Sequence, residues 1–567
     1  MLNRSKSNYR NPSRLKSRFA FLFLCVGLMI VMYSCWQETK NDPLSNKLVV
    51  PLTSDPTTYD PVRMWDASSH GRTSALLYNG LTRSDIEGNV IPDLADSILI
   101  SPNGLVYTFH LKRGVVFSNG QRLTANDVRF SFERLLLESP SSWVLERLVG
   151  ATEFVSSIRD SSEMEQSQED SVFVNKKRVR ISGIRVIDSY TIELKIQEPF
   201  APFLSLLALP QTYIISKDAV ERWGEDYGQN PVGTGPFTLK KWQPDYYLLF
   251  ERNPLYFGEK PKVESVEFRI IKEELTALAE FELGNLSFLP IPDAEYQRII
   301  SDTKRSSHIV SRNMLNSYGL NLNCGKPPFD NVLVRQALNH AIDRQTILER
   351  LLNGRGTLAH GVIPPGLGAY NSSAKGYEYN PEKAKELLRQ AGYPDGFSFD
   401  IWQSTEKSAL SICEAFQGYL QEVGIEASIV QNEWSVLKTA VRKGEIDSYY
   451  RAWSADYPDA ENFLYPIFHS EQPTTANLNF KNKKFDRLIE LARATQDPLH
   501  RITLYQAAEE LIIQEAPWVF FYHGTESWVY QPWVKGLEIP LIFNGDKMND
   551  IQIERNNSFD SDSSIEG

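Results

Sequence analysis

The stretch Ile446-Asp-Ser-Tyr-Tyr-Arg-Ala-Trp-Ser-Ala-Asp-Tyr-Pro-Asp-Ala-Glu-Asn-Phe-Leu464 reads as a β-strand that places an acid and then turns at a proline. Asp456 lies three residues after Trp453 and directly before Tyr457. A carboxylate among aromatic rings suits an organic ammonium group, which it binds by charge pairing and by contact with the ring faces. The same residues are also ordinary turn chemistry, in which Asp456 or Asp459 accepts hydrogen bonds from main-chain N–H groups. Taken alone, the stretch favours the turn.

The segments that precede this stretch change the balance. The pattern predicts strands at 397–402 and 427–430, and it predicts helices at 410–423 and 433–442. Such β-α-β-α-β alternation implies crossover connections and a largely parallel sheet. Ligands of these sheets bind at the carboxyl ends of the strands. Asp456 lies just past one such end, so a ligand-binding role gains support.

The rest of the chain predicts a mixed α/β protein with more than one domain. At 567 residues the chain exceeds a single ordinary core. Alternating apolar residues predict a half-buried strand at 106–111 and another at 191–196, whereas 156–170 is too polar for a core and reads as a surface loop. The apolar run 517–523 needs a buried sheet built from earlier parts of the chain. The polar segment 556–567 reads as a disordered tail.

The charge of the chain excludes one class of partner. The formal net charge is −11, and it becomes −17 without the first 34 residues, which carry six basic side chains and no acids. Nucleic-acid binding depends on neutralising phosphates, so we expect no nucleic-acid partner. A cationic or zwitterionic small ligand is compatible with this charge.

The N-terminus has the proportions of a signal peptide. A basic region precedes the apolar run 19–33, which is shorter than the roughly 20 residues of a membrane-spanning helix. Ser34-Cys35 then resembles a bacterial lipobox, in which Cys35 is lipidated and becomes the first residue of the mature chain, although Met32 and Tyr33 depart from its usual residues. The alternative is an uncleaved signal anchor in which Cys35 has no role.

Other chemistry finds little support in the sequence. The eight histidines form no metal-binding motif, and no GxSxG nucleophile motif is present, so we expect no metal, no cofactor and no enzyme. The segment 230–237 is rich in glycine but lacks the dinucleotide and P-loop patterns. Cys324 and Cys413 show no zinc spacing, and two buried free thiols are favoured over one disulfide.

Several segments, taken together and in order, resemble the large extracytoplasmic solute-binding proteins of peptide-type ABC importers (the oligopeptide- and dipeptide-binding proteins of solute-binding family 5). The resemblance covers about residues 47–555. Its segments are Tyr107-Thr-Phe-His-Leu-Lys-Arg-Gly-Val-Val-Phe117, Leu123-Thr-Ala-Asn-Asp-Val-Arg-Phe-Ser131, Pro231-Val-Gly-Thr-Gly-Pro-Phe237, Arg335-Gln-Ala-Leu-Asn-His-Ala-Ile-Asp343, Asn380-Pro-Glu-Lys-Ala-Lys385 and Trp453-Ser-Ala-Asp456.

The resemblance implies an α/β, two-lobed clamshell fold with an additional inserted α+β domain, whose lobes close over a ligand. The expected division is a signal peptide (1–34), a lipidated cysteine and linker (35–46), lobe I in three parts (47–82, 229–312 and 522–556), an inserted domain II (83–228), lobe III (313–521) and a disordered tail (557–567).

The resemblance also implies a set of ligand-binding residues. Asp456 matches the acid that pairs with the α-ammonium group of a bound peptide, Trp453 matches an aromatic residue beside it, and Trp434 matches a tryptophan of a side-chain pocket. Tyr318 and Tyr522 fall in segments that line the cleft. The main chain of Ser454 and Ala455, with that of 54–59, is expected to hold the peptide backbone as in strand addition.

The anchor for the carboxyl end of a peptide stays unassigned. Tyr450 occupies the place of an arginine that often meets this carboxylate, and Arg451 should face the opposite side of the strand. A second such position matches Gln403, with Lys407 nearby. Longer peptides, or ligands without a fixed carboxylate, are therefore favoured.

The sequence thus predicts a monomeric peptide receptor of the periplasm or cell envelope, held to a membrane by lipid on Cys35, that delivers its ligand to ABC permease subunits. One alternative is a receptor of the same fold for another solute, such as an oligosaccharide, a nickel chelate or haem. A secreted hydrolase is an alternative of a different class.

Overall fold

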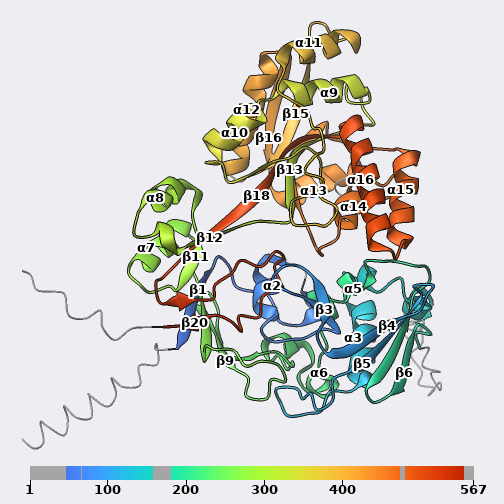
Figure 1. Cartoon of the computed structure of the whole chain (residues 1–567), viewed down its shortest axis with the longest axis vertical. Coiled ribbons are helices and arrows are strands. Elements are labelled where there is room, and N and C mark those ends of the chain that lie inside the picture. The colour runs from blue at the N-terminus through green and yellow to red at the C-terminus, as the bar shows by residue number, and fades with distance from the viewer. Residues whose placement is uncertain (1–45, 65–66, 158–179, 406, 473–478, 555–567) are drawn as a thin grey trace, which may run out of the picture.

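The computed structural model describes residues 46–64, 67–157, 180–405, 407–472 and 479–554. Strands and helices alternate through most of this range, and they form a mixed α/β architecture with several sheets (Figure 1). The predicted signal peptide, Cys35 and the C-terminal tail lie outside the described residues, as does most of the polar loop at 156–170.

Most of the largest sheet lies in the upper part of the molecule in Figure 1, and its strands β11 and β12 lie lower, close to β1. Its strands, in spatial order, are β11 (Phe288–Pro290), β18 (Trp518–Tyr530), β13 (Asn316–Leu322), β17 (Ser448–Ser454), β15 (Phe397–Ser404) and β16 (Ile425–Asn432), while β12 (Ile309–Asn313) and β14 (Gly356–Leu358) also pair with β18. The expected parallel arrangement holds for β15, β16 and β17. The sheet as a whole is mixed, because β13 pairs antiparallel with both β17 and β18.

Helices cover both faces of this sheet. On one face, four helices pack on Phe399, Ile401, Tyr450 and Phe521: α9 (Val332–Ala341), α10 (Arg344–Leu351), α11 (Pro381–Gln390) and α12 (Lys407–Gln421). On the other face, α13 (Trp434–Lys443) packs against Trp402 and Tyr449. A further group, α14 (Glu461–Phe468), α15 (Lys483–Ala494) and α16 (Pro498–Glu515), packs on Trp518 and Phe520.

A second sheet joins distant parts of the sequence. Strand β1 (Lys47–Leu52) runs parallel to β10 (Ser265–Ile270), and β9 (Tyr247–Arg252) and β8 (Phe237–Gln243) complete the sheet. Its core combines Leu48 with Phe268 and with Ile551 from the C-terminal segment. Around it lie α2 (Ala67–Ser74), α6 (Lys217–Trp223), α7 (Glu274–Glu282), α8 (Tyr296–Ser301), β19 (Val534–Lys535) and β20 (Gln552–Ile553).

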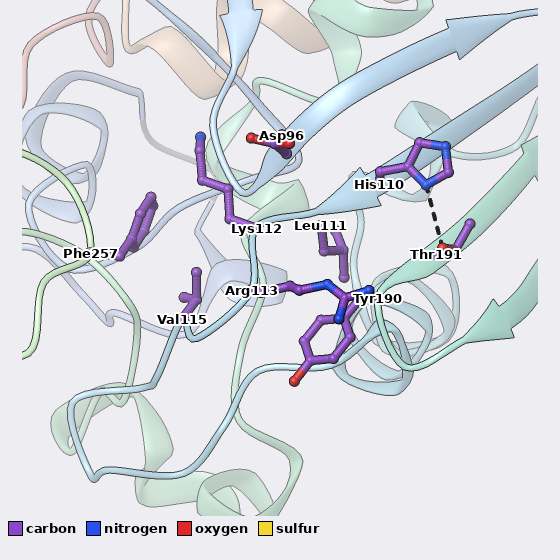
Figure 2. A pocket seen from close by; sticks show the side chains of 9 residues that line it. All are labelled: Asp96, His110, Leu111, Lys112, Arg113, Val115, Tyr190, Thr191 and Phe257. Carbon is purple, nitrogen blue, oxygen red and sulfur yellow. Dashed lines mark hydrogen bonds between the residues drawn. The ribbon is translucent and has the colours of Figure 1, made fainter.

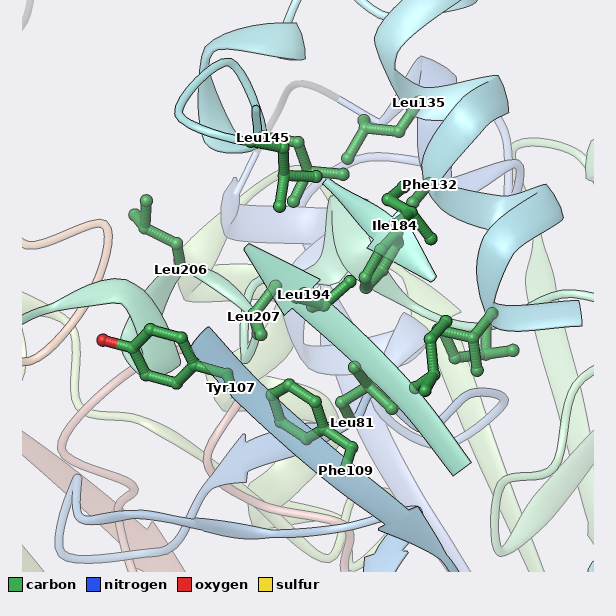
Figure 3. Packing of buried hydrophobic residues seen from close by; sticks show 14 of the residues in the cluster. Leu81, Tyr107, Phe109, Phe132, Leu135, Leu145, Ile184, Leu194, Leu206 and Leu207 are labelled. Carbon is green, nitrogen blue, oxygen red and sulfur yellow. The ribbon is translucent and has the colours of Figure 1, made fainter. Parts of the chain in front are cut away.

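A third body is built from residues between β1 and β8. Its sheet has the order β4 (Ala95–Ile100), β5 (Val106–Leu111), β7 (Thr191–Lys195) and β6 (Ile184–Asp188), and α3 (Ala125–Glu138), α5 (Phe203–Leu206), β2 (Thr82–Ser84) and β3 (Val90–Pro92) lie nearby. Helix α3 begins with a capping box between Thr124 and Asp127. Its residues Phe132 and Leu135 pack with Tyr107 and Leu194 of the sheet (Figure 3).

The upper part of the molecule contacts this third body at two places. Tyr457, which follows β17, is buried in the core of the third body. The main-chain N–H of Ala201 donates to the carbonyl of Arg493 at 2.8 Å. The Arg493 guanidinium group lies 5.2 Å from the ring centre of Phe200. The segment after β17 and helix α15 therefore both contact the third body.

Strand β18 is the longest strand of the described residues, and it links β13 to β11 and β12. Its first half pairs with β13, and its second half pairs with β11 and β12. The expected boundary between residues 521 and 522 falls inside this strand. The domain boundaries stay a prediction.

The two cysteines of the body are both free. Cys413 is buried and Cys324 is partly buried. The preference for free thiols over a disulfide is confirmed.

Candidate functional site

Asp456 lies two residues beyond β17, next to a place where two parallel strands separate. Strand β17 pairs with β13 over seven residues, but its ladder with β15 has only the pairs Ile401–Ser448 and Trp402–Tyr449. From Ala452 to Ser454 this edge of β17 has no strand beside it within the described residues. After β15 the chain continues to β16, whereas after β17 it continues to α14. The gap between the carboxyl ends of β15 and β17 is therefore a topological switch point, the kind of place where α/β sheets bind ligands.

The side chain of Asn462 holds the end of β17 in place. Its Oδ1 accepts the main-chain N–H of Asp456 at 2.9 Å and the indole Nε1–H of Trp453 at 3.3 Å, and its Nδ2 donates to Asp456 Oδ2 at 3.5 Å. Asn462 is buried in the first turn of α14. One buried amide thus fixes the predicted acid and the predicted aromatic residue relative to each other.

The environment of the Asp456 carboxyl group is unusual for an aspartate. The side chain keeps accessible surface, and yet burial among protein groups raises its pKa, while the contacts with Asn462 and the charge of Arg451 partly oppose this rise. Asp456 is thus exposed to solvent, while neighbouring protein groups partly desolvate its carboxyl group. A cationic ligand group that contacts the carboxylate would restore favourable interactions that it lacks.

Both predicted tryptophans lie next to the guanidinium group of Arg451. The guanidinium carbon is 4.7 Å from the ring centre of Trp434, the first residue of α13, and 5.6 Å from that of Trp453. Arg451 and Trp453 share one face of β17, as residues two apart in a strand must. Trp434, Trp453 and Asp456 are therefore brought together, and Arg451 joins them. Strand alternation predicts only that Arg451 faces away from Tyr450.

Asp459 performs the turn role. Asp459 Oδ1 accepts the main-chain N–H of Glu461 at 2.9 Å. Within the described residues, the only hydrogen-bond partner of the Asp456 carboxyl group is Asn462. Tyr457 does not flank Asp456, because its ring is buried in another core and its hydroxyl donates to Glu461. The turn interpretation thus applies to Asp459, and Asp456 is available for another role.

Ser454 and Ala455 contribute differently from each other. Ser454 ends β17 and is exposed. Ala455 is buried, and its N–H donates to the carbonyl of Leu315 at 2.8 Å. A ligand that contacts the main chain of Ala455 would have to use the carbonyl group. The earlier segment 54–59 forms no strand, and the N–H of Tyr59 is bonded to Gly228.

Tyr318 and Tyr522 lie on the other face of the sheet. Tyr318 is paired with Ala452 and with Tyr522 in the sheet register, and the two tyrosine rings stack with centres 4.3 Å apart. Together with Tyr450, they line a cavity of about 290 Å³. Asp293 and Arg355, which form an ion pair, line the same cavity. These residues are not brought together with Asp456, so the predicted set divides into two groups.

Gln403 has an environment that the sequence did not reveal. It lies near the carboxyl end of β15, is fully buried, and neither atom of its amide group has a hydrogen-bond partner within the described residues. Unsatisfied buried amides are costly and often mark a missing water or ligand. Lys407 begins α12, and its side chain lies outside the described residues.

A larger cavity, of about 510 Å³, lies on the third body, away from these residues. Its charged and aromatic groups contact each other: Figure 2 shows Arg113 over the Tyr190 ring, at 5.4 Å, and His110 directed at Thr191, at 3.4 Å.

In the described ranges, no group of three or more His, Cys, Asp or Glu side chains is placed to hold a metal ion. No helix of the described part combines the length and hydrophobicity needed to cross a membrane.

Comparison with known proteins identifies the family. The model of the bacterial extracellular solute-binding proteins, family 5 (Middle), matches residues 89–475. The chain belongs to this family. The glutathione-binding protein GsiB of Salmonella choleraesuis is 32% identical over 483 residues, which cover 83% of this chain and 88% of that protein. GsiB of Escherichia coli O6:K15:H31 is 32% identical over 500 residues, which cover 86% and 90%.

Solved structures of similar proteins agree with this family assignment. The periplasmic binding protein DppA of Helicobacter pylori, in complex with the peptide STSA, superposes with a TM-score of 0.71 at 28% identity, covering 90% of this chain and 98% of that chain. HbpA2 of Haemophilus parasuis superposes with a TM-score of 0.74 at 28% identity, covering 90% and 100%. The expected two-lobed α/β fold is confirmed. The chain is a periplasmic solute-binding protein of the type that serves ABC importers.

Proposed function

We propose that this family 5 protein binds peptides by their free amino end and delivers them to the permease of an ABC importer. The observation that carries this proposal is the Asp456 carboxyl group at the carboxyl end of β17, which Asn462 fixes beside Trp453. The carboxylate supplies the charge for an α-ammonium group, and the indole supplies a surface that attracts cations and apolar groups. Specific polar groups in a largely aromatic surrounding are typical of ligand sites.

The edge of β17 supplies the second part of the site. A peptide that lies along Ala452–Ser454 would add a strand to the sheet, in the space that opens where β15 ends. With its amino group at Asp456, this peptide would run antiparallel to β17, toward Gln403. Main-chain pairing of this kind gives affinity that depends little on the side chains of the ligand.

The relatives support a peptide ligand. The DppA structure contains the peptide STSA, and GsiB is named for glutathione, which is a tripeptide. We infer that the ligand of this protein is also a peptide and that the protein releases it unchanged.

Isothermal titration calorimetry with peptides of two to five residues tests the proposal. The purified protein, freed of bound ligand, should bind at least one peptide, and Asp456→Asn should weaken binding by tenfold or more. Asp395→Asn, which removes an exposed acid elsewhere, serves as the control and should bind normally. If no peptide binds, or if hydrolysis products are released, the proposed receptor function is wrong.

The proposal includes closure of the two lobes over the ligand. The contacts of Arg493 with Phe200 and Ala201 join the expected lobe III to the expected domain II. A ligand favours the closed state only to the extent that it binds that state more tightly. Small-angle scattering should show a smaller radius of gyration with bound peptide, and equal radii would reject closure.

The proposal also includes a lipid anchor. Cys35 lies outside the described residues, and its support is the lipobox-like sequence alone. Mass spectrometry of the protein from membranes should find a diacylglyceryl group on Cys35, and Cys35→Ser should move the protein to the soluble fraction. An unmodified Cys35 would reject the anchor.

A further inference from the structure

A second charge lies beside the proposed amino anchor. The Arg451 guanidinium group lies near the rings of Trp434 and Trp453, and its positive charge lowers the pKa of the Asp456 carboxyl group. Trp453 contacts Arg451 through its ring and contacts Asn462 through its Nε1–H. Asn462 in turn contacts Asp456. Trp453 and Asn462 therefore form a chain of contacts from Arg451 to Asp456.

This arrangement holds the guanidinium group in place. The ring centres of Trp434 and Trp453 lie 4.7 and 5.6 Å from its central carbon. Its Nε donates to the carbonyl of Ala452 at 3.1 Å, and its side chain also hydrogen-bonds that of Tyr449. Stacking uses the faces of a guanidinium group, whereas its N–H groups point outward in the plane and suit carboxylates. An arginine held in this way cannot easily swing away when a ligand enters.

The pair of charges has a consequence for the ligand. A ligand with only an ammonium group at this end gains from Asp456 but is repelled by Arg451. A ligand with a carboxylate near its amino group satisfies both residues. We propose that Arg451 determines specificity by selecting peptides that carry a carboxylate close to their free amino group, an inference that rests on the proposed function of Asp456.

Two kinds of peptide carry such a carboxylate. One has an acidic side chain at its first or second position. The other has a glutamate joined through its side chain, so that the α-carboxylate and the α-ammonium group stay on one carbon. Glutathione, for which the GsiB relatives are named, is of the second kind. The chemistry that Arg451 would recognise is the same in both.

A matched set of tripeptides tests the inference by calorimetry: Ala-Ala-Gly, Ala-Glu-Gly, Glu-Ala-Gly, γ-Glu-Ala-Gly and Ala-Lys-Gly. We expect at least one of the three acidic peptides to bind ten times more tightly than Ala-Ala-Gly, and Ala-Lys-Gly to bind more weakly. The tightest of the three identifies whether the carboxylate comes from a side chain or from a γ-linkage. Equal affinity of the acidic and neutral peptides would overturn the inference.

Variants of Arg451 assign the effect to this residue. Arg451→Gln should remove the preference for acidic peptides, Arg451→Lys should retain part of it, and Arg451→Glu should reverse it in favour of Ala-Lys-Gly. Each comparison is a ratio of affinities within one variant, so a general loss of stability does not imitate it. An unchanged ratio in Arg451→Gln would overturn the inference and leave the proposed function intact. If no peptide binds the wild-type protein, both fail.

Discussion

The side-chain oxygen of Asn462 accepts the main-chain N–H of Asp456 at 2.9 Å, and this bond sets where the Asp456 carboxyl group points. The same oxygen accepts the indole N–H of Trp453. Helix α14 thus positions the end of strand β17.

Replacing Asn462 by alanine should therefore weaken ligand binding without removing any ligand contact. The N–H groups of Asp456 and Trp453 lose their acceptor, which should lower the free energy of unfolding by about 1–3 kcal/mol. Peptide affinity should fall roughly tenfold, since the anchor loses its fixed orientation. Chemical denaturation and calorimetry measure the two effects separately. A folded variant with wild-type affinity would show that Asn462 does not position the site.

The strand-addition geometry makes a prediction about the ligand itself. Alternate residues of an added strand direct their N–H groups toward the neighbouring strand. N-methylation at successive amides of a binding peptide should therefore weaken binding about tenfold or more at alternate positions and much less between them. A uniform effect along the peptide would argue against pairing with β17.

The division of the predicted residues over two faces of the sheet gives a third prediction. Tyr318→Ala removes the partner that stacks on Tyr522 at 4.3 Å, so it should cost about 2 kcal/mol of stability. It should change the affinity for a dipeptide less than twofold, because Tyr318 lies away from Asp456. Trp453→Ala changes a residue on the same face as Arg451, and it should clearly weaken binding of the same dipeptide. Thermal unfolding and calorimetry of both variants check the contrast, and a stronger binding loss in Tyr318→Ala would contradict it.

Glu509 gives the stability a dependence on pH. It is 4% exposed and accepts the N–H of Ile363 at 2.8 Å, and burial raises its pKa to about 7, from an ordinary value of 4.5. The folded state thus keeps a proton that the unfolded state releases. This contribution to stability is complete below pH 4.5 and is lost as the pH rises toward 7, by roughly 3 kcal/mol.

The measurement compares urea unfolding of wild type and Glu509→Gln between pH 4.5 and 8. His523 acts in the opposite direction, because burial lowers its pKa to about 4, but it is present in both proteins and cancels in the difference. The stability of Glu509→Gln relative to wild type should increase with pH across this window. A constant difference would show that Glu509 keeps an ordinary pKa.

Local patterns predicted most of the elements around the site. The β-α-β-α-β alternation placed β15, β16 and β17 in parallel, because crossover connections permit little else. The apolar residues from 332 to 352 have the spacing of one continuous helix, but the structure divides this stretch into α9 and α10. Asp343 accepts the N–H of Thr346 at 3.0 Å and starts a new helix there, a capping signal hidden in an otherwise helical pattern.

The composition of the site was less predictable than its place. Strand alternation placed Arg451 opposite Tyr450, but only the position of α13 brings Trp434 against it. Asn462 was missed because its contacts depend on the angle at which α14 leaves the turn. A polar residue on the buried side of an apolar helix is the signal that would have indicated it. Tyr318 and Tyr522 were assigned to the same site as Asp456 because a sequence shows segments, and the face of the sheet depends on register.

The central claim is that Asp456 binds the free amino group of a peptide, and one calorimetric experiment tests it directly. A binding peptide and its N-acetylated form are each titrated into wild type and Asp456→Asn. We expect acetylation to weaken binding to wild type by tenfold or more and to have little effect on Asp456→Asn, because the charge pair is already absent there. An acetylated peptide that binds wild type as tightly as the free peptide would contradict the account.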